Sequence, residues 1–258
     1  MALPIEKCIG EISDAQFLEK VFTDIDTILH IASIKLTPHI VDAAVKCGVR
    51  RLICVHTTGI YSKYKEAGEE YRRIDAYVEE QCRLHGIALT ILRPTMIYGN
   101  ISDNNVVKFI RMVDKFPMMP VVNGARYALQ PVHYMDLSEA YYQVVMNEST
   151  AGHNYNLSGG APILLRDMLT EIGKNLGKKV HFISCPFGVA YVGACLIYGF
   201  SFKKIDYREK VQRLCEPRVY PYDDAKLDFG YIPRGFQDGI GDEVKEYIVL
   251  KHNKDGIV

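Results

Sequence analysis

Short runs of β-branched and aromatic residues alternate with amphipathic helical segments over the first hundred residues. This alternation predicts strands at IEKCIGEI (5–12), TILHIA (27–32), RLICVHTT (51–58) and ALTILRPTMIYG (88–99). Between them it predicts a helix from Ser13 with a Ser13–Gln16 capping box, a helix from Thr37–Pro38 to near Gly48, and a helix over 69–85. Strands separated by helices form parallel sheets, so the sequence predicts an α/β fold.

The alternation loosens after residue 100. The pattern predicts a helix over 104–115, a strand that ends at His133, and a helix from Asp136. Further strands are expected at 154–160 and 180–184, with a helix over 164–176 between them. No internal repeat or low-complexity linker separates these segments. We therefore expect a first domain over 1–160 and a smaller lobe over 161–258 that is interwoven with the first.

Charge and cysteine content narrow the class of protein. Lys and Arg number 31, as do Asp and Glu, so the net charge is zero and no basic block predicts a nucleic-acid partner. Seven cysteines are scattered without CxxC or metal-ligand spacing, which predicts reduced thiols and no metal site. The first residues lack the pattern of a secretory signal. These features favour a cytoplasmic protein.

Residues 186–202 carry no charge and are followed by Lys203 and Lys204. The stretch has 17 residues and three glycines, which makes it short for a membrane-spanning helix. The pattern favours a buried or groove-lining helix, and contact with a membrane surface is the alternative.

Several stretches, in a fixed order over nearly the whole chain, resemble one family. They are GEISDAQFLEKVF with DTILHIASIK, then HTTGIYSKY, LTILRPTMIYGN, LQPVHYMDLSEAYYQV, NYNLSGG and YDDAKLDFGYIP. In this order they resemble the extended and atypical short-chain dehydrogenases, the NAD-dependent epimerase/dehydratase family. The resemblance implies a Rossmann-like, doubly wound parallel sheet with NAD or NADP across the carboxyl ends of its strands, and a small C-terminal lobe that binds the substrate.

The resemblance assigns cofactor contacts residue by residue. It places Glu11 and Ile12 beside the adenine, and Ala32, Ser33 and Lys35 along the cofactor after a strand end. Pro94 and Ile97 match the segment that touches the nicotinamide. Thr57 matches the hydroxyl residue that hydrogen-bonds the reacting oxygen, and its neighbour Thr58 is the alternative. The implied activity is that of an NAD(P)-dependent oxidoreductase, epimerase or dehydratase acting on a small carbonyl or hydroxyl substrate.

The catalytic pair departs from the family pattern. Family enzymes use a tyrosine and, four residues later, a lysine that lowers the tyrosine pKa; here these positions are Tyr71 and Asp75. An anion beside a phenol raises the phenol pKa, so Tyr71 is expected to be a poor base. The alternative is a non-catalytic member of the family that acts as a sensor or assembly factor.

The substrate site departs from the family as well. Sugar-nucleotide epimerases carry a phosphate-binding arginine where this chain has Leu129, which argues against a nucleotide-linked sugar. Arg126 and Arg218 are the substitutes that the sequence offers for binding a small-molecule substrate. The sequence also allows a homodimer.

No glycine-rich turn that could hold a pyrophosphate follows a strand in this sequence. The resemblance makes the first predicted strand the family's third, so we expect an N-terminally truncated sheet from an inactive fragment or a truncated reading frame. NAD(P) binding is expected to be weak in such a chain, and the sheet edge beside the missing strand is expected to be exposed.

Overall fold

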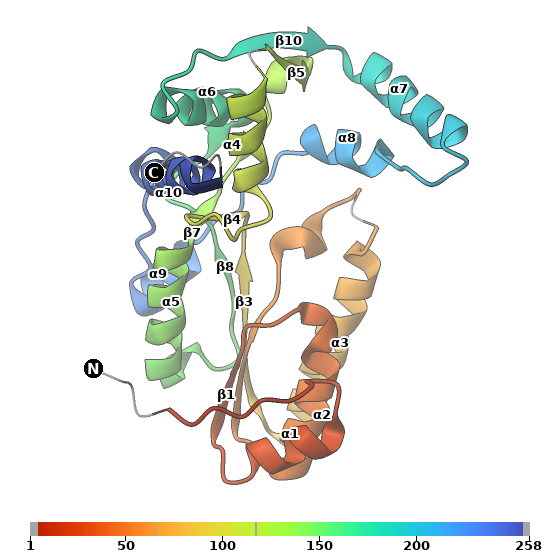
Figure 1. Cartoon of the computed structure of the whole chain (residues 1–258). Helices are drawn as coiled ribbons and strands as arrows, with labels where there is room; N and C mark the ends of the chain where they lie inside the picture. Colours follow the sequence, from red (N-terminus) through yellow and green to blue (C-terminus); the bar gives the residue numbers. More distant parts are fainter. Residues whose placement is uncertain (1–4, 65, 117, 255–258) are drawn as a thin grey trace.

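A parallel sheet forms the centre of the molecule. The computed structural model describes residues 5–64, 66–116 and 118–254 (Figure 1). The strands β1 (Thr27–His30), β2 (Arg51–Val55), β3 (Ala88–Pro94) and β8 (Asn154–Leu157) pair in parallel in the order β1-β2-β3-β8. The predicted α/β class is therefore confirmed.

Helices cover both faces of this sheet. On one side lie α1 (Ala15–Phe22), α2 (Thr37–Cys47) and α3 (Gly68–His85), and on the other lie α5 (Tyr134–Met146) and α9 (Asp223–Phe229), as Figure 1 shows. Side chains of a strand alternate between faces, so Leu52 packs with the first group of helices and Ile53 with the second. Both faces are buried, which explains why β2 has no polar alternation. The sheet is doubly wound, as predicted.

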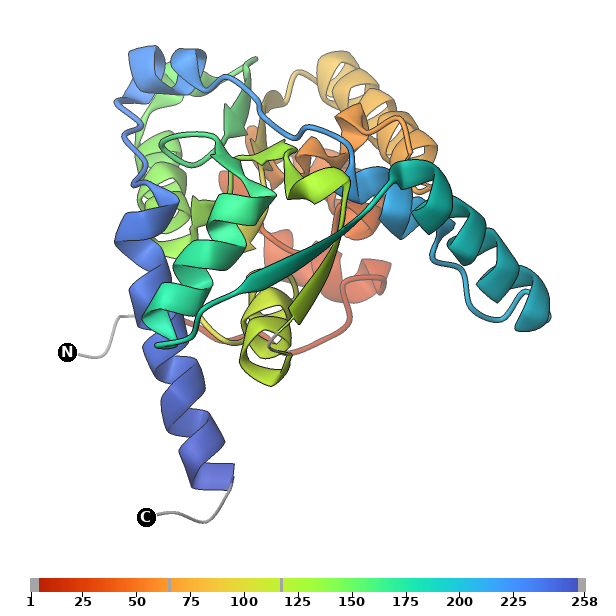
Figure 2. The ribbon, with the colours of Figure 1, turned by 90° about the horizontal axis from the view of Figure 1, so that it is seen from above.

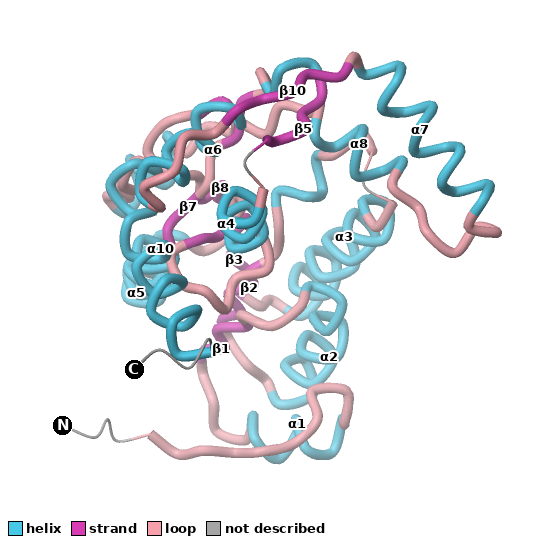
Figure 3. The backbone as a smooth tube through the Cα atoms, turned by 45° about the horizontal axis from the view of Figure 1, so that its top comes forward, coloured by secondary structure: helices cyan, strands magenta, loops and turns pink. Residues whose placement is uncertain are grey.

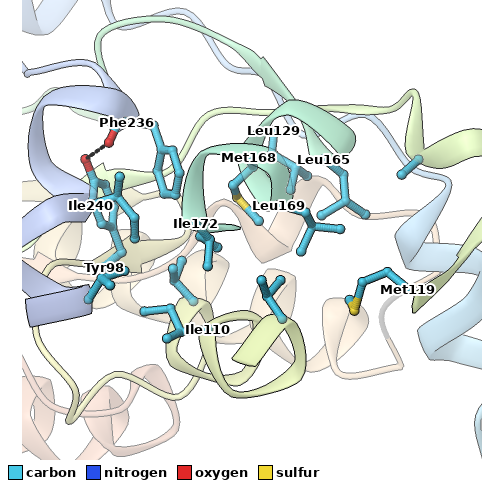
Figure 4. Close-up of a cluster of buried hydrophobic side chains, with 14 of the residues drawn as sticks. Tyr98, Ile110, Met119, Leu129, Leu165, Met168, Leu169, Ile172, Phe236 and Ile240 are labelled. Carbon is cyan, nitrogen blue, oxygen red and sulfur yellow. Dashed lines mark hydrogen bonds between the residues drawn. The ribbon is translucent and has the colours of Figure 1, made fainter. Parts of the chain in front are cut away.

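The second lobe has its own core. It contains α4 (Val106–Lys115), α6 (Leu165–Asn175), α10 (Phe236–Lys254) and the parallel pair of β5 (Met118–Val122) and β10 (His181–Cys185). Figure 4 shows Ile110, Met168, Ile172 and Ile240 converging from α4, α6 and α10. Segments before and after residue 160 thus build this lobe together.

Short elements connect the two parts. β4 (Ile97–Tyr98) pairs with β7 (Val132–His133), and β6 (Ala128–Leu129) pairs with β9 (Ile163–Leu164). Single turns of 3₁₀ helix occur at η1 (Ile34–Leu36), η2 (Thr58–Tyr61), η3 (Asn123–Ala125) and η4 (Glu148–Thr150). The helices α7 (Phe187–Phe200) and α8 (Arg208–Leu214) follow β10.

The strand predicted at residues 5–12 is wrong. These residues are irregular, and Ile9 is 94% exposed. A strand needs a hydrogen-bonding neighbour, and among the described strands β1 is paired only with β2. The apolar run 5–12 is therefore not used as a strand here.

Three helix starts also differ from the prediction. Asp14 caps α1 by accepting hydrogen bonds from the backbone N–H groups of Gln16 and Phe17, so Ser13 is not the cap. The hydroxyl of Thr37 bonds His56 and does not cap α2. α5 begins two residues before Asp136. Asp, Ser and Thr have similar capping preferences, so a choice between neighbours depends on backbone geometry that the sequence does not display.

Glu243 of α10 joins the last helix to the loop after β4. Its Oε2 accepts a hydrogen bond of 2.8 Å from the backbone N–H of Gly99. Gly99 has φ 121°, and a Cβ at this position would lie 2.4 Å from Nε2 of His133, so only glycine fits. Burial and the nearby carboxylate of Asp103 raise the pKa of Glu243 to about 9.

We expect Glu243→Gln to stabilise the fold by roughly 1–3 kcal/mol at pH 7. The raised pKa means that the folded state holds a proton that the unfolded state releases above its own pKa, so this contribution to stability falls as pH rises from about 5 toward 9. Gln keeps the hydrogen bond from the backbone N–H of Gly99 without titrating. Urea unfolding at pH 5 and pH 8 checks this: the gain should be larger at pH 8, and an equal change at both values would contradict it.

Candidate functional site

A polar pocket of about 210 Å³ lies beyond the carboxyl ends of β2 and β3. Its walls come from the η2 turn, from the segment after β3, from α4 and β6, and from α8 with the loop that follows. The lining residues are Thr57, Thr58, Gly59, Ser62, Thr95, Met96, Asn105, Leu129, Gln130, Arg213, Arg218 and Tyr220. In open parallel α/β sheets, ligands bind at this edge.

Hydrogen bonds fix the floor of the pocket. Thr57 begins η2, and its hydroxyl accepts a bond of 3.0 Å from the backbone N–H of Gly59. Thr58 donates from Oγ1 to the carbonyl of Pro94 at 3.2 Å, which ties η2 to the end of β3. The two threonines that follow β2 thus anchor the η2 turn, one to its own backbone and the other to β3.

Gln130 fixes the opposite wall. Its Nε2 donates to the carbonyl of Gly159 at 2.8 Å, and its Oε1 accepts from the backbone N–H of Tyr220 at 3.2 Å. The amide therefore joins the strand ends to the loop after α8. Because Gln130 is 4% exposed and satisfied on both sides, it holds the loop that carries Arg218.

Arg213 and Arg218 bring two guanidinium groups to one pocket. The Nε atoms of both are buried without a hydrogen-bond partner among the residues that the structure describes. Burial, together with the nearby charge of Arg213, lowers the pKa of Arg218. Glu216 lies close by, but its carboxylate accepts from Ser62 Oγ at 2.6 Å and from the backbone N–H of Lys63 at 2.9 Å. The pocket is therefore suited to an anion.

The structure brings together only part of the predicted site. Thr57 and Arg218 line the pocket, and Pro94 and Ile97 lie next to it at the end of β3 and in β4. Arg126 is exposed beside η3 and is not a lining residue of the pocket. Arg213 and Gln130 were missed by sequence reasoning, although Gln130 belongs to the quoted LQPVHYMD stretch. The sequence around Arg213 contains no motif that would single this arginine out from the others.

The other predicted cofactor residues lie after β1 and before α1, and none of them lines the pocket. Ala32 and Ser33 follow β1, and Lys35 forms an exposed ion pair of 2.6 Å with Glu70 of α3. Glu11 and Ile12 lie just before α1, in the irregular segment. Their roles remain predictions.

Asp75 occupies the buried end of a hydrogen-bonded network. Its carboxylate contacts Nδ1 of His56 and Nη2 of Arg93, both at 2.6 Å. Nε2 of His56 in turn lies 3.1 Å from the Thr37 hydroxyl. Burial raises the pKa of Asp75, but the hydrogen bonds from His56 and Arg93 outweigh burial, so its pKa lies below the ordinary value. Tyr71 is half-buried one turn earlier on α3.

This network changes the interpretation of the departure from the family pattern. The charge of Asp75 is compensated by the guanidinium of Arg93, which is 8% exposed, so the carboxylate is not an isolated anion beside Tyr71. Asp75 links α3 to β2 and β3, since His56 follows β2 and Arg93 belongs to β3. The aspartate therefore stabilises the packing of α3 on the sheet.

The described residues fit only part of a nicotinamide dinucleotide. Residues predicted to contact the nicotinamide side lie at the carboxyl ends of β2 and β3, beside the pocket. Within the described ranges, however, no strand-to-helix turn presents a glycine cluster for a pyrophosphate. We therefore assign no redox step to the chain.

We expect the 258-residue chain to bind NADH and NADPH only weakly, with Kd near the millimolar range. Each hydrogen bond to a charged group contributes about 1.5–3 kcal/mol, so missing two of them weakens binding by roughly 100-fold or more. Isothermal titration measures this directly. A micromolar Kd for either cofactor would contradict the expectation.

Comparison with known proteins agrees with this fold. No protein-family profile matches the chain. A curated relative, the N-acetyl-α-D-glucosaminyl-diphospho-ditrans,octacis-undecaprenol 4-epimerase of Escherichia coli O157:H7, is 20% identical over 217 residues. The match covers 72% of this chain, and the chain spans 65% of that relative.

Solved structures share the fold at low identity. UDP-glucose 4-epimerase from Thermotoga maritima, determined with UDP-glucose, is 15% identical with a TM-score of 0.70, over 94% of this chain and 84% of that one. dTDP-glucose 4,6-dehydratase from Streptomyces venezuelae, determined with NAD and TYD, is 18% identical with a TM-score of 0.68, over 93% of this chain and 78% of that one.

Proposed function

Because the chain is an epimerase/dehydratase-like protein with the Rossmann-like fold of the extended short-chain dehydrogenases, we propose that its pocket binds a sugar linked to a diphosphate. The observation that carries this proposal is the pair Arg213 and Arg218, whose Nε atoms are buried and unpartnered in the described structure. Two guanidinium groups beside hydroxyl and amide side chains suit a ligand with an anionic half and a polyhydroxyl half.

The compounds associated with the relatives support the same chemistry. The Escherichia coli relative is named for a diphosphate-linked N-acetylglucosamine, and the Thermotoga maritima enzyme was determined with UDP-glucose. Both carry a sugar on a diphosphate, but the group beyond the diphosphate differs. The shared part of these ligands is the part that Arg213 and Arg218 are suited to hold.

The pocket contains positive charge although position 129 is a leucine and not an arginine. Leu129 lines the pocket, but the backbone of Arg218 runs beside it, and the N–H of Arg218 donates to the carbonyl of Ala128 at 2.9 Å. The guanidinium groups are therefore supplied by residues 213 and 218. Loss of an arginine at position 129 is compatible with diphosphate binding.

Catalysis by this chain is a separate matter from binding. When bound, an NAD-family cofactor would accept or donate hydride at the sugar, and the neighbours from Streptomyces venezuelae and Thermus thermophilus were determined with NAD. In this chain Thr57 offers a hydroxyl in the pocket, and Tyr71 lies on α3 beyond η2. The engagement of Asp75 by His56 and Arg93 favours a second candidate function, a non-catalytic sugar-diphosphate binder.

A ligand series tests the proposal. We expect the chain to bind UDP-glucose and UDP with similar affinity, uridine and glucose at least about tenfold more weakly, because charged hydrogen bonds to phosphate contribute about 1.5–3 kcal/mol each. Isothermal titration at fixed salt gives the affinities. Equal affinity for uridine and UDP would show that the diphosphate is not recognised.

A further inference from the structure

The helix α7 extends from the body of the molecule beside α8, as Figures 1 and 2 show. It contacts α8 through one side only. On that side Ala194 is buried, and the guanidinium of Arg208 of α8 lies 3.8 Å from the ring centre of Tyr198. In Figure 3 the same helix lies at the margin of the molecule. The rest of its surface is left uncovered by the described chain.

The uncovered side of α7 is a stripe of large apolar residues. Val189, Val192, Leu196 and Phe200 are 63%, 57%, 54% and 82% exposed. Their spacing of three and four residues places them on one face, opposite Ala194 and Tyr198. We call this stripe the outer face of α7. The expectation of a buried or groove-lining helix is wrong for this face.

An uncovered apolar face of this kind calls for a partner. A helix that is apolar on all sides is normally buried, because exposed apolar surface is unfavourable in water. Contiguous exposed apolar surface marks a protein or membrane contact. We therefore expect the outer face of α7 to contact another apolar surface.

The charged residues next to α7 indicate what kind of surface it contacts. Lys203 and Lys204 follow the end of α7, and both are exposed. Phe202, 87% exposed, and Lys203 form the turn at the end of α7, with φ of 53° and 66°. An exposed phenylalanine next to two lysines matches the boundary between acyl chains and anionic headgroups.

We propose that the outer face of α7, together with Phe202, Lys203 and Lys204, binds the surface of an anionic lipid bilayer. The helix lies in the interface and does not cross it. α7 has 14 residues and is about 21 Å long, whereas a bilayer core is about 30 Å thick. Over the described residues, no helix combines the length and the apolar character that crossing a membrane requires.

A lipid surface explains these features better than a second copy of the chain. A second copy would bring the same lysines to the contact, and the carboxylates that follow them, Asp206 and Glu209, are already paired with Arg208 and Arg213. A bilayer that contains anionic lipids supplies both the apolar phase and the opposite charge.

The membrane contact would also lie close to the pocket. α8, on which α7 packs, carries Arg213 at the pocket wall. If the proposed function holds, a sugar diphosphate attached to a lipid would reach the pocket from the bilayer. The argument for a membrane contact depends on α7 and the turn after it, and not on sugar binding. It can therefore be tested without a sugar ligand.

Vesicle flotation of the full chain tests the proposal, with phosphatidylcholine vesicles compared with vesicles that also contain phosphatidylglycerol. We expect flotation with the anionic vesicles. Leu196→Glu or Phe200→Glu should lower the partition coefficient by about tenfold or more, because each removes an apolar side chain from the interface. Lys203→Gln with Lys204→Gln should lower it by about tenfold on anionic vesicles only.

Leu227→Glu on α9 is the matched control, since Leu227 is 80% exposed but lies away from α7. It should float like the wild type, and thermal melts should show that all variants fold. The proposal is overturned if the folded wild type does not float with anionic vesicles, or if Leu196→Glu floats unchanged. A dimer in sedimentation analysis that Leu196→Glu dissociates, without flotation, would assign the outer face to a second copy instead.

Discussion

Replacing Asp75 with alanine is expected to lower the free energy of unfolding by about 3–5 kcal/mol. The substitution leaves the guanidinium of Arg93 and the ring of His56 buried without the carboxylate that both contact at 2.6 Å. An uncompensated buried charge costs much more than the pair contributes. Urea unfolding followed by circular dichroism at pH 7 measures the loss.

Tyr71→Phe is the matched control on the same helix, since it removes one hydroxyl from a half-buried side chain and no buried charge. It should change the unfolding free energy by less than about 1 kcal/mol. If Asp75→Ala proved as mild as Tyr71→Phe, the network would not hold α3 on the sheet.

The Asp75 network also predicts the acid limb of stability. The folded pKa of Asp75 lies below its ordinary value, so the contribution of this carboxylate is present above pH 4 or so and is lost as pH falls through the folded pKa. Asp75→Asn should flatten this part of the stability profile. A lysine at position 75 would place a second cation beside Arg93, so it is expected to unfold the chain and not to restore a catalytic pair.

The double substitution Arg213→Gln with Arg218→Gln is expected to weaken UDP binding by about 100-fold or more. Hydrogen bonds to charged groups contribute about 1.5–3 kcal/mol each, and the double variant removes two guanidinium donors from the pocket. The variant loses the ion pair of 3.5 Å between Arg213 Nη1 and Glu209, so a thermal melt must show that it still folds. Isothermal titration with UDP at fixed salt gives the ratio of affinities.

Arg111→Gln is the control for net charge, since Arg111 is an exposed arginine of α4 outside the pocket. It should change UDP affinity by less than about threefold, as expected for a distant and screened charge. A similar loss in Arg111→Gln and in the double variant would mean that general charge, and not the pocket, attracts the ligand.

Local signals in the sequence were sufficient for most of the fold. Gly48 and Gly86 end α2 and α3 in the left-handed conformation, as their positions after amphipathic runs predicted. The β-branched runs at TILHIA, RLICVHTT and ALTILRP became β1, β2 and β3, in the predicted parallel arrangement. Each of these features depends on residues close together in the chain.

Features that depend on distant neighbours were not predictable. Residues 5–12 have strand-like composition, but a strand requires a partner, and the run pairs with no described strand. The apolar composition of residues 186–202 predicted a buried helix. In the structure only one side of α7 is packed, and it packs against α8. Gln130 reaches Thr57 and the loop that carries Arg218 only through tertiary structure, so the sequence could predict some of the pocket residues but not how they come together.

A crystal structure of the chain soaked with UDP-glucose tests the central claim most directly. We predict that the diphosphate lies between the guanidinium groups of Arg213 and Arg218, with the sugar toward Thr57 and Gln130. A diphosphate bound elsewhere, for example beside Ser33 and Lys35 after β1, would contradict the assignment of this pocket.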